Sequence, residues 1–201
     1  MNTLFPVDTG YPEGFEYEPG FISREEEDVL LEHIKGIELH TFVFQGFEAK
    51  RRTASFGYDY SFDSRKLSRG QDIPKVFTPL IQSVANKLSI NPSQFGELLV
   101  TEYPVGAVIN WHRDAPPFNI IAGISLNADC IFKLRPHSIV KEKNVMPPVE
   151  GQKTRKKSAI ISVPVQRRSL YIMKGPARSA WQHSTAPVTD VRYSITLRTL
   201  L

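Results

Sequence analysis

A histidine and an aspartate two positions apart, His112 and Asp114, precede the proline-rich break in the stretch NWHRDAPP. In an extended strand, residues i and i+2 point to the same face, so this imidazole and carboxylate could converge on one metal ion. The alternative is that both are ordinary polar residues at the end of a strand. So short a pattern arises readily by chance, and a metal site needs a third ligand.

Four further histidines are candidates for that third ligand. His33 and His40 lie in or just after an expected helix, without companion ligands, and His137 lies in a polar stretch. His183 follows a predicted strand and a short turn, which places it best to return to a β-rich site. Two histidines and a carboxylate form the facial triad of non-haem Fe(II) oxygenases. Zinc hydrolases use the same ligand types, so the triad indicates a metal enzyme without choosing its chemistry.

The last predicted strand, RYSITLR, alternates polar and apolar residues from Arg192 to Arg198. Its polar residues, including both arginines, therefore share one face. Arginines that face inward are costly to bury unless anions pair with them. Asp or Glu partners could satisfy them, or the face could lie in solvent. A bound dicarboxylate is the third possibility, because the planar guanidinium matches a carboxylate.

The elements that must position these residues are two helices followed by many short strands. A capping box in SREE predicts a helix over residues 23–35, and Thr78-Pro79 predicts the start of a second helix that runs to residue 88. After residue 95 come short β-rich segments: LLVTEY, AVINWH, NIIAGISL, CIFKLR, AIISVPV, SLYIMK and RYSITLRTL. This order predicts a mainly β fold with flanking helices, as a sandwich or jelly roll.

Composition predicts one globular domain over residues 1–201, with 41% hydrophobic and 23% charged residues. No apolar run reaches the roughly 18 residues that a membrane span needs, and the N-terminus lacks the pattern of a signal peptide. The single cysteine, Cys130, excludes an intramolecular disulfide. We therefore expect a cytoplasmic protein with no membrane partner.

The net charge of +4 is unevenly distributed. Between Lys133 and Arg178 there are only two acids, and the basic run KTRKK occupies residues 153–157. Such a segment could hold the phosphates of a nucleic acid, or it could be a solvated loop.

Taken together, HRD at residues 112–114, the later His183 and RYSITLR resemble the AlkB-like Fe(II)/2-oxoglutarate-dependent dioxygenases. This family includes the oxidative repair enzymes for alkylated nucleic acids, and its pattern is His-x-Asp, a distal His, then Arg-x-Asn-x-Thr-x-Arg. The resemblance covers roughly Phe56 to the C-terminus, including TEYPVGAVINWHRD, GISL and GPARSAWQHS. Four ordered motifs make the match specific. It implies a double-stranded β-helix (jelly roll) with outer helices, whose core starts at about residue 95 after N-terminal helices and a substrate-lid region.

The resemblance implies that His112, Asp114 and His183 are the iron ligands and thus the catalytic centre. The cofactor would be Fe(II), with 2-oxoglutarate and O2 as co-substrates. Oxidation of 2-oxoglutarate to succinate and CO2 would be coupled to hydroxylation of a C–H bond. On an N-alkyl group, the product would fall apart to an aldehyde and the free nitrogen.

The same resemblance assigns residues to 2-oxoglutarate. Arg192 would pair with its distal carboxylate, helped by the Tyr103 hydroxyl, and Arg198 would lie near the carboxylate that chelates iron. Ser194 and Thr101 stand where the family often has asparagine. Both keep hydrogen-bonding ability in a shorter side chain.

The segment KRRTASFGYDY, residues 50–60, resembles the family's substrate-lid region. Arg51 and Arg52 would contact phosphates, and Phe56, Tyr58 and Tyr60 would stack on a flipped or single-stranded base. The alternative is that these aromatic residues alternate on a strand and pack on the core. Several family members carry an acid after the metal aspartate to read a base edge, where this chain has APPF.

The leading hypothesis is a monomeric dioxygenase that demethylates or dealkylates damaged bases of DNA or RNA. One alternative is a 2-oxoglutarate-dependent hydroxylase or demethylase of a modified tRNA base, a protein side chain or a small molecule. Another is a non-catalytic nucleic-acid-binding module. The complete triad and both arginines argue against a binding module, which would need neither.

Overall fold

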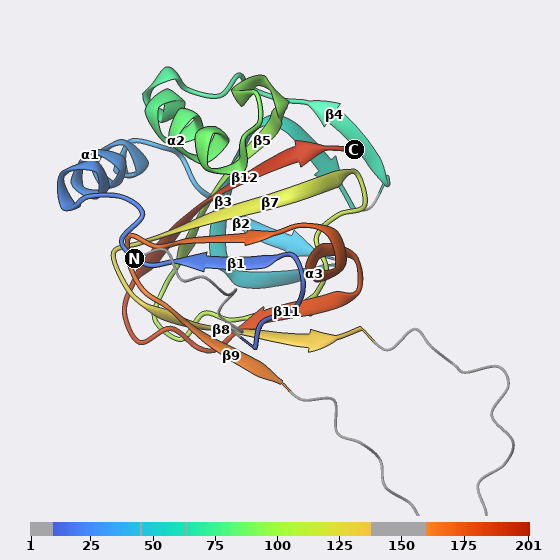
Figure 1. Ribbon diagram of the computed structural model, residues 1–201. Coiled ribbons are helices and arrows are strands. Elements are labelled where there is room, and N and C mark those ends of the chain that lie inside the picture. Colours follow the sequence, from blue (N-terminus) through green and yellow to red (C-terminus); the bar gives the residue numbers. More distant parts are fainter. Residues whose placement is uncertain (1–9, 45, 63, 138–159) are drawn as a thin grey trace, which may run out of the picture.

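Two facing β-sheets form the body of the protein, and helices cover the larger sheet (Figure 1). The computed structural model describes residues 10–44, 46–62, 64–137 and 160–201. Neighbouring strands pair antiparallel. The eight-stranded sheet has the order β1 (Phe15–Glu18), β10 (Leu170–Met173), β7 (Phe118–Leu126), β12 (Arg192–Leu200), β5 (Phe95–Tyr103), β3 (Phe47–Ser61) and β2 (His40–Phe44), with β4 (Lys66–Arg69) paired to β3. The four-stranded sheet has the order β6 (Ile109–His112), β11 (Trp181–Thr185), β8 (Cys130–Pro136) and β9 (Ile161–Val165).

The first helix, α1 (Arg24–Lys35), begins at the predicted capping box. The Glu26 N–H donates to Ser23 Oγ at 3.1 Å, and the Ser23 N–H donates to the Glu26 carboxylate at 2.7 Å. These bonds satisfy amide groups that a helix start leaves unpaired. The helix therefore starts where the local sequence predicts.

The second helix, α2 (Thr78–Leu88), begins one residue earlier than expected. Phe77 is its N-cap, because a short 3-10 turn, η1 (Lys75–Phe77), leads directly into it. The helix ends at Ser89, in the left-handed conformation with a φ of 54°. A second 3-10 turn, η2 (Pro92–Gln94), then leads into β5.

Buried apolar residues form two clusters, one on each face of the larger sheet. The helix-side cluster lies between this sheet and the helices, and its members include Leu30, Ile34, Leu80, Val84, Leu98, Val100, Ile124, Ile195 and Leu197. The inter-sheet cluster lies between the two sheets, and its members include Phe15, Tyr103, Phe118, Ile121, Phe132, Leu134, Val163 and Tyr171. Strand β12 thus turns its apolar residues to the helices and its polar residues to the space between the sheets.

The prediction of a mainly β jelly roll with outer helices is confirmed. The first ninety residues contribute more to the sheet than the sequence predicts, because β1, β2, β3 and β4 all join the larger sheet. The basic run at residues 153–157 lies outside the described residues. None of the helices in the described part of the chain has the length and hydropathy of a membrane span.

Candidate active site

The three predicted metal ligands lie together at neighbouring strands of the smaller sheet. His112 ends β6, and His183 lies opposite it in the register of β11. Asp114 follows two residues after His112, as the His-x-Asp spacing anticipates. One potential ligand atom from each residue lies within 4.8 Å of the others, and the two imidazole centroids are 4.1 Å apart. Such a cluster has the size and donor set of a divalent metal site.

Hydrogen bonds leave one potential ligand atom of His112 and one of Asp114 free to face an ion. His112 Nδ1 lies 2.8 Å from the Asn110 carbonyl oxygen, so a proton on Nδ1 leaves Nε2 as the ligand atom. Asp114 Oδ1 accepts a hydrogen bond from Arg198 at 2.7 Å. Asp114 Oδ2 is buried without a hydrogen-bond partner among the described residues and lies 3.5 Å from His183 Nε2. An unpaired buried carboxylate oxygen is costly, and a bound cation would satisfy it.

The protonation states also suit a metal ion. Burial lowers the pKa of His183 to about 3, and burial likewise lowers the pKa of His112. Burial alone would raise the pKa of Asp114, but the Arg198 guanidinium and the two imidazoles outweigh it and hold that pKa well below its ordinary value. At neutral pH the site therefore presents two neutral imidazoles and one carboxylate, the forms that bind metals.

Neighbouring side chains restrict how these ligands can move. The Phe132 ring stacks on His183 with centroids 5.3 Å apart and an angle of 15°. From the short helix α3 (Gly175–Ser179), Arg178 Nη2 donates to the carbonyl oxygens of Asp114 at 3.1 Å and Ala115 at 2.7 Å. The backbone that carries Asp114 is thereby tied to the short helix that leads into β11, the strand that carries His183.

Arg198 has acidic partners within the chain. Its Nη1 lies 2.6 Å from Glu97 Oε2, and its Nη2 lies 2.7 Å from Asp114 Oδ1. Glu97 is 2% exposed and also accepts a hydrogen bond from Ser55 Oγ at 2.9 Å. Sequence reasoning missed Glu97. The available signal is an acid at an inward position of the apolar strand FGELLVTEY.

Arg192 lies on the same face and has no acidic partner in the described part of the chain. It is 2% exposed, its Nε donates to Ser125 Oγ at 2.9 Å, and its guanidinium lies 4.8 Å from the centroid of the Tyr103 ring. Ser194 pairs with Thr101 in the strand register and donates to the Tyr103 hydroxyl at 3.5 Å. A buried guanidinium without an anion, surrounded by hydroxyl groups, has the chemistry of a carboxylate site.

The residues predicted to contact substrate divide between the two faces of β3. Arg51 is half-buried, and its guanidinium lies 3.9 Å from the centroid of the Phe42 ring. Four residues further along the strand, Ser55 bonds Glu97 in the space between the sheets. Residues an even number apart share a face, so Arg51 lies on the side of the larger sheet that faces the triad.

Arg52 and Phe56 lie on the helix-covered face instead. Arg52 forms a bidentate ion pair with Glu102, with Nη2 at 2.8 Å from both carboxylate oxygens. Phe56 is 7% exposed within the helix-side cluster. Neither side chain faces the triad.

The aromatic residues of β3 do not share one face, because Gly57 interrupts the alternation. Its φ is +85°, and a Cβ there would lie 2.2 Å from the Gly96 carbonyl oxygen. Beyond this glycine, Tyr58 is half-buried opposite Arg69, and Tyr60 packs against the inter-sheet cluster. The prediction of regular alternation thus fails at the one residue whose backbone conformation breaks it.

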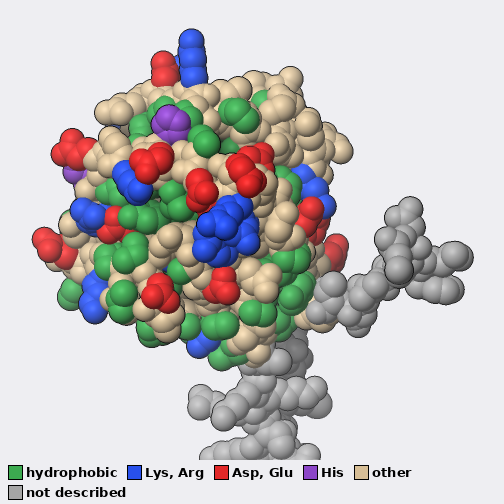
Figure 2. Space-filling view, turned by 90° about the vertical axis from the view of Figure 1, so that its left-hand side faces the viewer, with side chains coloured by type: hydrophobic (Ala, Val, Ile, Leu, Met, Phe, Trp, Pro, Cys, Tyr) green, Lys and Arg blue, Asp and Glu red, His purple; other side chains and the backbone are tan. Residues whose placement is uncertain are grey.

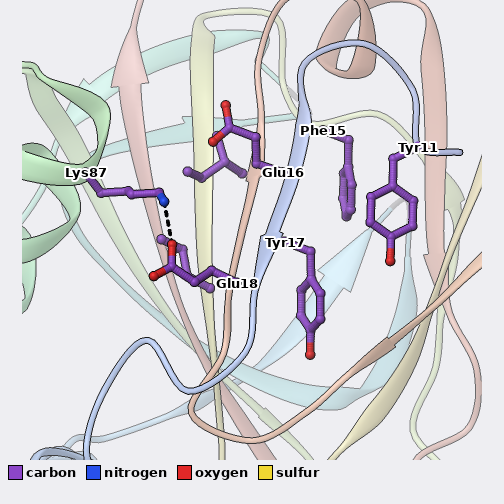
Figure 3. Close-up of a pocket in the computed structure, with 8 residues that line it drawn as sticks. Tyr11, Phe15, Glu16, Tyr17, Glu18 and Lys87 are labelled. Atoms are coloured by element: carbon purple, nitrogen blue, oxygen red, sulfur yellow. Dashed lines mark ion pairs between the residues drawn. The ribbon is translucent and has the colours of Figure 1, made fainter. Parts of the chain in front are cut away.

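A pocket of about 270 Å³ beside β1 contains none of the triad residues. In Figure 3, Tyr11, Phe15 and Tyr17 lie on one side of the strand, and Glu16 and Glu18 lie on the other. Lys87 pairs with Glu18 at 2.5 Å. Lys174 likewise pairs with Glu16 at 2.7 Å, so each charged residue that lines this pocket has a counter-ion.

Comparison with known proteins agrees with this geometry. The family model described as the 2OG-Fe(II) oxygenase superfamily matches residues 19–198. The mouse (Mus musculus) protein tRNA (carboxymethyluridine(34)-5-O)-methyltransferase ALKBH8 is 25% identical over 176 residues, which cover 83% of this chain and 23% of that protein. The chain thus spans about a quarter of the length of this curated relative.

Solved structures share the fold. OsALKBH1 has a TM-score of 0.65 at 14% identity, covering 92% of this chain and 96% of that one. A Pseudomonas putida prolyl-4-hydroxylase has a TM-score of 0.59 at 13% identity, covering 94% and 93%. A Trichoplax adhaerens prolyl hydroxylase, solved with a peptide fragment of hypoxia inducible factor, has a TM-score of 0.61 at 13% identity, covering 93% and 83%. The chain belongs to the 2OG-Fe(II) oxygenase superfamily and is a dioxygenase that uses Fe(II), 2-oxoglutarate and O2.

Proposed function

We propose that this dioxygenase removes alkyl groups from the bases of DNA or RNA, with His112, Asp114 and His183 as its iron ligands. The observation that carries the assignment of the centre is the convergence of three free ligand atoms on one point. Two neutral imidazoles and one carboxylate leave coordination positions open for co-substrates. When bound, the iron and 2-oxoglutarate supply the oxidation of a C–H bond, coupled to formation of succinate and CO2.

Arg192 receives the distal carboxylate of 2-oxoglutarate in this proposal. It is buried, it lacks an acidic partner among the described residues, and it faces the same inter-sheet space as the triad. Tyr103, Ser194 and Thr101 line the adjoining positions of β5 and β12 with hydroxyl groups that can hydrogen-bond the same carboxylate. Arg198 acts differently, since its contact with Asp114 Oδ1 keeps Oδ2 turned to the metal.

Cationic side chains near the triad support a nucleic-acid substrate. Arg51 lies on the inward face of β3 and stacks on Phe42, and the exposed Arg113 stands between two of the proposed ligands. Lys50 Nζ reaches to within 3.5 Å of a Cβ built at Gly106, in the loop that leads to β6. Cations beside an aromatic ring suit a phosphate next to a stacked base. The mouse relative, whose name describes action on a tRNA uridine, supports the same substrate class.

The face of the molecule shown in Figure 2 carries charges of both signs. Figure 2 shows Lys and Arg side chains interspersed with Asp and Glu on the face that forms the left-hand side of Figure 1. A mixed surface of this kind does not attract a polyanion as a single-sign patch does. We therefore propose that nucleic acid approaches the surface formed by the start of β3 and the loops on either side of β6, near Arg51, Lys50 and Arg113.

The experiment that tests this function supplies Fe(II), 2-oxoglutarate and O2 to the protein with N-alkylated single-stranded DNA or RNA oligonucleotides. We expect loss of the alkyl mass together with an equal amount of succinate, measured by mass spectrometry. Succinate formation without any change in the oligonucleotides would contradict a nucleic-acid substrate. It would redirect the search to proteins and small molecules.

Arg51 and Arg52 provide a matched pair for the substrate surface. The Arg51→Gln variant should raise KM for the oligonucleotide several-fold, because a phosphate contact is worth about 1 kcal/mol or more near a protein surface. The Arg52→Gln variant removes an equal charge from the opposite face and should change KM less than twofold. An equal rise in KM in both variants would indicate a general effect of charge and not a direct contact between Arg51 and the nucleic acid.

A further inference from the structure

Tyr171, a residue of β10, lies across strand β7 at a glycine. Tyr171 and Gly123 are partners in the register of the two strands. A Cβ built at Gly123 would lie 2.1 Å from Tyr171 Cζ and 2.4 Å from its hydroxyl oxygen. Any larger residue at position 123 would therefore displace the ring. The phenol extends over the sheet towards β12 only because position 123 has no side chain.

This ring lies between the triad and Arg192. On one side its centroid is 4.9 Å from that of Phe132, which in turn stacks on His183. On the other side, Ser125 follows Gly123 by two residues on the same face of β7 and holds the Arg192 guanidinium. A co-substrate that spans from the triad to Arg192 must therefore pass the Tyr171 hydroxyl.

The hydroxyl of Tyr171 has no hydrogen-bond partner among the described residues, although the residue is only 8% exposed. Tyr17 offers a direct contrast. It is the register partner of Tyr171 in β1, and its hydroxyl accepts a hydrogen bond from the Gln166 N–H at 2.9 Å. A hydroxyl with little access to water and no hydrogen-bond partner is unfavourable, as is a buried guanidinium without an anion. The Tyr171 hydroxyl thus lies near the Arg192 guanidinium, which has no acidic partner among the described residues.

We propose that Tyr171 is a further 2-oxoglutarate-binding residue, whose hydroxyl donates a hydrogen bond to a carboxylate oxygen of the co-substrate. The proposal rests on the assignment of Arg192 to the same co-substrate. Burial, with the neighbouring Tyr103, raises the pKa of Tyr171 well above its ordinary value, so the phenol stays protonated and remains a donor at neutral pH. Gly123 has a defined role as well, because it leaves room for the ring.

The test measures binding of 2-oxoglutarate to the Mn(II)-loaded protein without O2, by isothermal titration calorimetry. A hydrogen bond to a charged group contributes enough that Tyr171→Phe should weaken binding by about tenfold. The affinity for Mn(II) itself should change less than about twofold, because Tyr171 is not a ligand. Tyr17→Phe is the matched control and should leave both affinities unchanged, since its hydroxyl is already hydrogen-bonded to the Gln166 N–H.

A double-mutant cycle with Gly123→Ala separates a direct contact from general damage to the fold. Gly123→Ala displaces the ring and should weaken 2-oxoglutarate binding, and Gly123→Ala in the Tyr171→Phe background should cost less affinity than in the wild type. Wild-type affinity in Tyr171→Phe would overturn the proposal, as would an equal loss in Tyr17→Phe. If Arg192→Met leaves 2-oxoglutarate binding intact, the assignment of Arg192 fails instead, and the two failures are distinguishable.

Discussion

Arg192 and Arg198 occupy the two ends of one strand face, yet their surroundings are opposite. Arg198 lies between the carboxylates of Glu97 and Asp114, whereas Arg192 contacts a serine hydroxyl and the face of a tyrosine ring. Strand β5 makes the difference, because it places Glu97 opposite Arg198 and Tyr103 opposite Arg192. One arginine has its counter-ions within the chain, and we propose that the other pairs with a ligand. The comparison teaches that a buried charge indicates a binding site only where the fold withholds its counter-ion.

The largest expected effect is a loss of metal binding on substitution of the triad, which lies beside Arg198. His183→Ala should weaken binding of Mn(II) by more than about 100-fold, because removing a ligand costs more than the 10- to 100-fold typical of a residue that only supports one. Turnover of 2-oxoglutarate should disappear with it. His33→Ala, on the exposed side of α1, is the control. Retention of tight metal binding in His183→Ala would show that the three residues are not the site.

Exchanging each arginine for methionine tests the comparison directly. Arg198→Met leaves Glu97 and Asp114 buried without their cation, so the free energy of unfolding should fall by about 3–5 kcal/mol. Arg192→Met removes a buried charge that has no anion, so the same quantity should change by less than about 1 kcal/mol. Urea denaturation of the metal-free proteins measures both.

The affinities of the same two variants for 2-oxoglutarate should follow the opposite order. Arg192→Met, which should keep its stability, should lose the more affinity. Arg192→Met should weaken 2-oxoglutarate binding by about 100-fold, since a buried charged partner of a carboxylate contributes about 3 kcal/mol. A variant at position 192 that loses stability but keeps 2-oxoglutarate affinity would reverse the roles proposed for the two arginines.

A smaller effect is expected at Glu97, which touches Asp114 only through Arg198. Glu97→Gln keeps the shape of the side chain but removes its charge, so Arg198 will compete more strongly with a metal ion for Asp114. We expect about tenfold weaker Mn(II) binding, the size typical of groups that orient a ligand. Glu102→Gln is the matched control, because Glu102 lies on the same strand but pairs with Arg52 on the other face. Similar losses in both variants would assign Glu97 a purely structural role.

The smallest effect is a pH dependence of stability. Burial lowers the pKa of His183 from 6.5 to about 3, so the unfolded chain takes up a proton as the pH falls below about 6.5, and the folded protein does not. The free energy of unfolding of the metal-free protein should therefore fall with decreasing pH, by up to about 1.4 kcal/mol per pH unit for this group. His183→Gln should flatten the slope between about pH 6.5 and pH 5, measured by thermal denaturation. An unchanged slope would mean that His183 is readily protonated in the folded state.

Local patterns in the sequence predicted several features well. The capping box at Ser23 and the strand alternation of RYSITLR depend on neighbours in the chain, and both appear as expected. The aromatic residues of β3 were harder to place, because the left-handed backbone at Gly57 turns Phe56 and Tyr60 into different clusters. A glycine in a strand signals an interruption, but it does not say to which face the following residues turn.

The residue pattern by itself indicated a metal enzyme, from a His-x-Asp pair and a later histidine. The ordered motifs, through their resemblance to a known family, then implied a dioxygenase. Only the tertiary structure decided that Arg198, and not Arg192, has its anions within the described part of the chain. It also decided that the Tyr171 hydroxyl lies near Arg192. The physical reason is that a charge in the interior is satisfied by whichever strand lies next to it. Spacing along one strand sets the face on which a side chain lies, whereas the register between strands sets its partner.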